Sequence, residues 1–167
     1  KGSSAYYYGK AGKDVIKGGR TDMILSTAKR VAEAEEASPS GYALLDRIKN
    51  DYNSIKKLGD KVDTVSGRQK LGALQMRLAA TGYLPQVEQS AINILNNPEA
   101  AAEAYRKMGA VDENGAPIEI TAEKLTDGID LGAIAKMDGK EQMVALRRAI
   151  SDNKLLLTMA VADATGN

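Results

Sequence analysis

The chain has 167 residues, enough for one domain, and its 43% apolar content is enough to build a core. Because 23 Lys and Arg face 22 Asp and Glu, the net charge is only +1, which does not predict nucleic-acid binding. The chain lacks His and Cys, so serine–histidine triads, cysteine–histidine dyads, thiolate sites and histidine zinc sites are excluded.

Residues 1–20 read as a lead segment, flexible or extended as a helix, ahead of a single helical domain over residues 21–167. The segment holds three tyrosines and then four cations at spacings of three, four and three: Lys10, Lys13, Lys17 and Arg20. On a helix these cations share one face, which predicts an anion-binding surface. Four glycines weaken that helix, and a solvated face is the alternative interpretation.

Five helices are predicted next, in chain order. The first covers residues 22–37, with Thr21 as its cap and Pro39 beyond its end. The second follows Ser40 and ends at Gly59. Ser66 caps a third that stops near Gly82, and Pro85 opens a fourth. Asn97 and Pro98 start a short fifth helix that closes at Gly109.

The pattern breaks at residues 110–121. Residues 112–115 predict a turn, and residues 116–120 predict a short strand. Thr121 caps a short helix, and Asp138 with Glu141 forms a capping-box pattern for a last helix that runs to about Ala164. The fold class predicted is therefore mainly α, a bundle of about six helices with a short irregular or β insert near 110–121.

Two apolar stripes are candidates for binding a protein partner. They recur at helical spacing and consist of Leu71, Leu74 and Leu78 in the third helix and Leu146, Ile150 and Leu157 in the last one. Packing in the core of the protein is the commoner use of such a stripe and stays open as the alternative. Self-association through either stripe is the corresponding prediction.

No motif predicts a cofactor, a metal site or a catalytic centre. The run from Gly9 to Asp14 lacks the first glycine and the hydroxyl residue of a phosphate-binding loop. A calcium loop starting at Asp112 would place Pro117 where glycine is required. A carboxylate-dependent hydrolase would need two acids that converge in a cleft, and the acid pairs in the sequence are equally typical of solvated surface.

Two stretches resemble bacterial proteins that assemble. The run 65–78, which contains Leu-Gly-Ala-Leu-Gln-Met-Arg, resembles a flagellin helix segment, with Met76 where flagellins carry Asn. Residues 119–121, 127–129 and 143–153 are similar in order to type III secretion filament and translocator proteins. The resemblance implies a secreted, virulence-associated helical protein with a small insert. Prolines at 39, 85 and 98 depart from the long helices of filament subunits.

The sequence thus predicts a non-enzymatic structural or interaction protein of bacterial or phage origin. It would bind a protein partner or itself through helix faces, with secretion or a virion favoured over the cytoplasm. The alternative is a module that binds an anionic partner (nucleic acid, lipid or acidic protein) through the cations from Lys10 to Arg20. No run of about 20 apolar residues predicts a membrane span.

Overall fold

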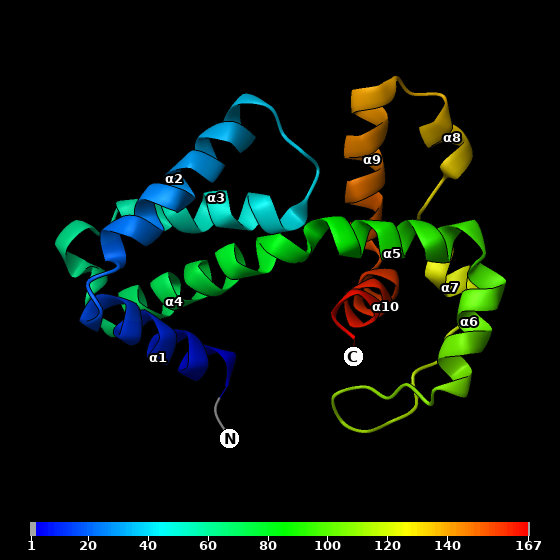
Figure 1. Cartoon of the computed structure of the whole chain (residues 1–167), viewed down its shortest axis with the longest axis horizontal. Helices are drawn as coiled ribbons and strands as arrows, with labels where there is room; N and C mark the ends of the chain where they lie inside the picture. Colours follow the sequence, from blue (N-terminus) through cyan, green and yellow to red (C-terminus); the bar gives the residue numbers. More distant parts are fainter. Residues whose placement is uncertain (1–2, 167) are drawn as a thin grey trace. The chain divides into compact units, whose positions relative to one another are not determined.

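The computed structural model describes residues 3–166, which are mainly helical, as predicted (Figure 1). The chain divides into two compact units, Lys1–Gly82 and Tyr83–Asn167. Residues 4–17, which the sequence assigns to a lead segment, form a helix that packs within the first unit. Residues 1–2 of the expected lead segment lie outside the described range.

Within residues 3–82, unit 1 is built from four α-helices and a short 3₁₀ turn. Their bounds are α1 Ser4–Lys17, α2 Thr21–Ala37, α3 Ala43–Lys56, η1 Gly59–Val62 and α4 Val65–Ala80. In Figure 1, α2 and α3 form a pair, and α1 lies along α4. A second 3₁₀ turn, Thr81–Tyr83, then leads into α5.

Helices α1 and α4 approach until their backbones touch. A Cβ on Gly12 would collide with the backbone carbonyl of Arg68, and a Cβ on Gly72 would collide with that of Tyr8. Since residue 12 meets residue 68 while residue 8 meets residue 72, the two helices run antiparallel. Helix propensity predicts that Gly12 weakens its helix, but Gly12 and Gly72 together allow a backbone contact that no residue with a side chain permits.

The core of unit 1 joins all four helices. Its buried members are Val15, Ala28, Ile48, Ile55, Leu71 and Leu74. Burial of one such Leu or Ile side chain contributes about 1.5–3 kcal/mol. At the surface, Arg77 on α4 pairs with Asp51 on α3 at 2.5 Å, and its guanidinium lies 6.0 Å from the ring centroid of Tyr8 on α1. Hydrophobic burial and these polar contacts therefore hold α1, α3 and α4 together.

Unit 2 contains six α-helices in the described residues. Their bounds are α5 Leu84–Asn96, α6 Pro98–Lys107, α7 Ala122–Thr126, α8 Leu131–Ala135, α9 Gly139–Asp152 and α10 Lys154–Thr165. Helix α10 packs against α5, α7 and α9. Their shared core is centred on the fully buried Leu125 and Leu156, with Ile120 almost fully buried beside them.

The last helix is broken at Asn153, although its apolar spacing predicts one continuous helix. The side chain of Asn153 is buried, and its oxygen accepts a hydrogen bond from the backbone N–H of Leu156 at 3.0 Å. Its amide nitrogen donates to the carbonyls of Lys124 at 2.9 Å and Asp127 at 3.1 Å. Asn153 thus ends α9, caps α10 and fixes α7 in place.

The insert between α6 and α7 is irregular, as predicted, but the predicted strand at residues 116–120 is wrong. One isolated antiparallel bridge joins Val111 and Pro117, and no strand forms in the described residues. Proline at 117 cannot donate to a ladder, which is the physical reason. The expected turn does form, because Asp112 Oδ1 accepts from the N–H groups of Asn114 and Ala116.

The glycine contact in unit 1 gives a first prediction. Gly12→Ala should lower the free energy of unfolding by about 1–3 kcal/mol or more, because the added methyl group forces α1 away from α4. Gly9→Ala is the matched control in the same helix, since its Cβ would lie 3.5 Å from Gln69 Cγ, an ordinary contact. Urea unfolding should show Gly9→Ala as neutral or stabilising; equal stability of the two variants would contradict the packing described.

The role of Asn153 gives a second prediction. Asn153→Asp keeps the cap acceptor but loses two donated hydrogen bonds and faces two carbonyls, so the free energy of unfolding should fall by about 2–4 kcal/mol. Asn97→Asp is the control, because the exposed Asn97 only accepts, from Ala100 N–H. That change should stay within about 0.5 kcal/mol. Similar unfolding midpoints for both variants would argue against the anchoring role.

Candidate functional site

The near-zero net charge of the chain conceals two units of opposite charge. Unit 1 carries 15 Lys and Arg against 9 Asp and Glu, a net charge of +6. Unit 2 carries 8 against 13, a net charge of −5. Fields of opposite sign attract different partners, so the candidate surfaces are best considered one unit at a time.

The predicted cations do gather on α1. Lys10, Lys13 and Lys17 are exposed on the side of α1 opposite to the buried Gly12 and Val15. We call these three lysines the basic face. Within the described residues, none of them takes part in an ion pair. They therefore remain available to an external anion.

Arg20 lies beyond the end of α1 and so does not share its helical face as predicted. The helix ends at Lys17, and Gly19 has a φ of 70°, which turns the chain toward α2. The Arg20 side chain nevertheless folds back, because its Nε lies 3.2 Å from the position that a Cβ on Gly18 would take. It thus lies near the C-terminus of α1, where the helix dipole favours a cation.

A shallow groove of about 420 Å³ runs beside the basic face, between α1 and α4. Tyr6, Lys10 and Lys13 line it from α1, and Arg68 lines it from α4. Arg68 is partly neutralised, since its Nε lies 2.7 Å from Asp63 Oδ1. The groove therefore combines an exposed tyrosine ring with free ammonium groups.

Unit 2 has a larger groove, of about 1030 Å³, which sequence reasoning missed. We call it the acidic groove. Five acids line it: Asp112, Glu113, Glu119, Glu123 and Asp127. Two lysines, Lys124 and Lys154, also line it, together with the apolar Val111, Pro117, Ile118 and Leu155. The insert, α7 and α10 bring these residues together, so no local motif in the sequence signals the groove.

The acids of the acidic groove differ in whether their carboxylates already have hydrogen-bond or ion-pair partners within the protein. Asp112 accepts two backbone hydrogen bonds in its turn, and Glu119 pairs with Lys124 at 3.0 Å. In the part of the chain that is described, Glu113, Glu123 and Asp127 have exposed carboxylates outside any ion pair. These three carry the groove's available negative charge.

The six apolar residues predicted to bind a partner lie in or against the cores. Leu71, Leu74 and Ile150 are buried. Leu78 packs partly buried against the core of unit 1, and Leu146 and Leu157 pack in the same way in unit 2. Core packing, the alternative interpretation of both stripes, accounts for this placement, and we base no binding proposal on them.

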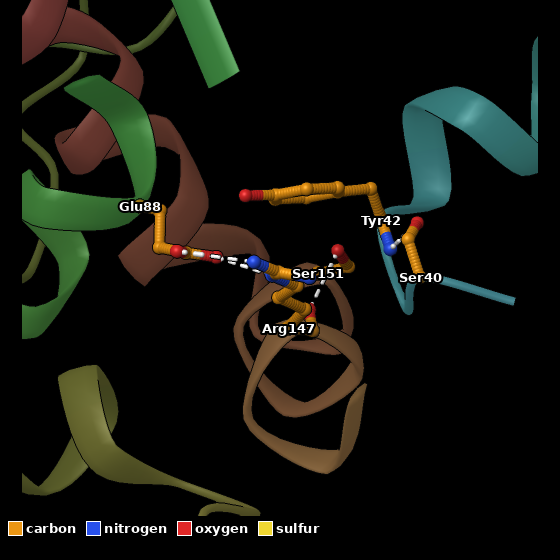
Figure 2. Close-up of polar contacts among 5 residues, drawn as sticks. All are labelled: Ser40, Tyr42, Glu88, Arg147 and Ser151. Carbon is orange, nitrogen blue, oxygen red and sulfur yellow. Dashed lines mark hydrogen bonds and ion pairs between the residues drawn. The ribbon is translucent and has the colours of Figure 1, made fainter. Parts of the chain in front are cut away.

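Glu88 on α5 and Arg147 on α9 form an ion pair within unit 2. Arg147 Nε donates to Glu88 Oε2 at 2.5 Å, and Figure 2 shows the two side chains end to end. The Ser151 hydroxyl turns back to the Arg147 carbonyl at 2.9 Å. In the α2–α3 loop of unit 1, Ser40 Oγ accepts from the N–H of Tyr42 at 3.1 Å. The ion pair joins two helices of unit 2, and the two hydrogen bonds stabilise local structure.

The pKa of Tyr105 is raised above its ordinary value, first by burial and second by the negative charge of Asp163. A raised pKa keeps the phenol neutral, which is the opposite of what a tyrosine base requires. Among the described residues, no three acidic side chains are grouped so that they could hold a metal ion.

No family model, curated protein or solved structure matches the chain. The resemblances to flagellin and to type III secretion proteins therefore stay predictions. None of the helices in residues 3–166 is long and apolar enough to cross a membrane.

Proposed function

We propose that the protein is a non-enzymatic interaction protein that binds an acidic protein surface through the basic face of α1. The observation that carries the proposal is the backbone contact at Gly12 and Gly72, which holds α1 against α4 and leaves Lys10, Lys13 and Lys17 exposed. Because the helix is already held in place, its backbone loses little conformational entropy when a partner binds.

The charge of the whole unit supports this role. A net charge of +6 in unit 1 surrounds the basic face with a positive field, which speeds the encounter with an acidic partner. Exposed Tyr6 beside the lysines adds apolar area to the same surface. Together these features suit a polar, salt-sensitive protein contact. They favour the anionic-partner alternative over binding through the apolar stripes.

A binding titration of the full chain with labelled poly-L-glutamate tests the proposal. Binding should weaken as ionic strength rises from about 0.01 M to about 0.15 M, because the Debye length falls from about 30 Å to about 8 Å. Replacing the four predicted cations, Lys10, Lys13, Lys17 and Arg20, by Ser should raise Kd about thirtyfold. Four contacts of about 0.5 kcal/mol each give that factor.

The matched control replaces four exposed cations elsewhere in unit 1 by Ser: Lys29, Arg30, Lys56 and Lys57. It has the same net charge, and at about 0.15 M salt it should bind within about twofold of the unchanged chain, since charges away from the basic face are then largely screened. Equal losses in both variants would show that net charge alone matters and would refute a site on α1. Tight binding of duplex DNA without binding of poly-L-glutamate would overturn the choice of a protein partner.

A further inference from the structure

The basic face and the acidic groove are opposite in charge and belong to the same chain. Lys10 and Lys17 stand seven residues apart, which is about 10 Å along a helix. The three available carboxylates, Glu113, Glu123 and Asp127, come from the insert, from α7 and from the residue after α7. The three lysines of the basic face thus equal in number, and oppose in charge, the three available carboxylates of the acidic groove.

The chemistry of the groove also suits lysine-bearing helices. Its apolar lining, from Val111, Pro117, Ile118 and Leu155, can pack against the methylene stems of lysines while the ammonium groups reach the carboxylates. The exposed Tyr6 offers a further ring for the same lining. A purely polar anion-binding or cation-binding site would not need these apolar walls.

We propose that the partner of the basic face is the acidic groove of a second copy of this chain. This inference rests on the proposed function, whose acidic protein surface it identifies. Because the two contacting surfaces differ, the contact is heterologous, and each bound copy still presents one free surface of each kind. The protein therefore associates head to tail. It forms a closed ring if the rotation from one copy to the next adds up to a full turn, and an open chain if it does not.

Charge reversal in the full-length chain tests the pairing. The first variant carries Lys10→Glu, Lys13→Glu and Lys17→Glu; the second carries Glu113→Lys, Glu123→Lys and Asp127→Lys. Light scattering at about 0.15 M salt, where the Debye length is about 8 Å, should give the unchanged chain a mass that rises with concentration above the monomer value of 17.8 kDa. Each variant alone should stay monomeric, because its basic face and its groove then repel each other.

An equimolar mixture of the two variants should associate again. The reversed face of the first variant attracts the reversed groove of the second, and the unreversed face and groove also remain matched. A chain with all six changes should likewise self-associate. A monomeric mixture, or an unchanged chain that is monomeric at every concentration, would overturn the inference.

The matched controls reverse three exposed charges outside these surfaces. One carries Lys29→Glu, Arg30→Glu and Lys56→Glu, and the other Glu99→Lys, Glu141→Lys and Asp152→Lys. Both should associate within about twofold of the unchanged chain, since the charges removed are screened beyond a Debye length. Loss of association in these controls equal to that in the surface variants would also count against the pairing.

A thiol cross-link provides a second readout that does not depend on charge-reversed variants folding. The chain has no Cys, so Lys13→Cys in one copy and Glu123→Cys in another introduce unique thiols. Mixing the two with oxidised glutathione, which accepts the two electrons, should yield a mixed disulfide, whereas Lys13→Cys with Glu99→Cys should not. Equal yields from both mixtures would overturn the inference. If poly-L-glutamate binds but neither association nor the specific cross-link appears, the proposed function stands and the second copy is excluded as partner.

Discussion

Helix α1 lies against α4 with backbone touching backbone, and this contact is possible only because positions 12 and 72 carry no Cβ. The remainder of unit 1 builds on it. Val15 reaches the core only when α1 is in place. Tyr8, also on α1, contacts the guanidinium of Arg77 on α4. The lysines then stay exposed on α1. Without the glycines, the same cations would belong to a tethered segment with no defined direction.

The distribution of charge depends on this architecture. A net charge of +1 describes the whole chain, but the boundary at Gly82 separates a unit of +6 from a unit of −5. In unit 2, Asn153 fixes α7 relative to α10, and these elements carry Glu123, Asp127 and Lys154 to one groove. A buried amide thus determines where the exposed carboxylates lie. The proposed binding surfaces are consequences of two close contacts in the interior.

Local signals in the sequence predicted most helix positions. Asn97 and Thr121 cap the helices that they were expected to cap, because an N-cap needs only neighbours within three residues. Other caps shifted: Thr64 takes the role expected of Ser66, and Asp138 precedes α9 without a side-chain cap bond. The interruption at Asn153 was missed, because Leu146, Ile150 and Leu157 continue one apolar period across it.

The candidate site was predicted only in part. The spacing of Lys10, Lys13 and Lys17 correctly placed three cations on one helix face, whereas Arg20 follows the helix. The acidic groove depends on residues 111–127 meeting residues 154–158, a tertiary contact that no local pattern encodes. Gly12 was interpreted through helix propensity alone, and Gly72 only as part of the run that resembles a flagellin helix. The helix–helix contact that these glycines allow outweighs their low helix propensity, which destabilises a helix by about 1 kcal/mol for each glycine.

Amide hydrogen exchange of α1 tests the central claim most directly, because it reports whether the basic face is held in place before any partner binds. If the glycine contact holds α1 on α4, the amides of residues 8–17 should exchange with protection comparable to that of α4, since both helices then open together. Exchange of these amides at the rate of an unfolded chain, while α4 remains protected, would contradict the account.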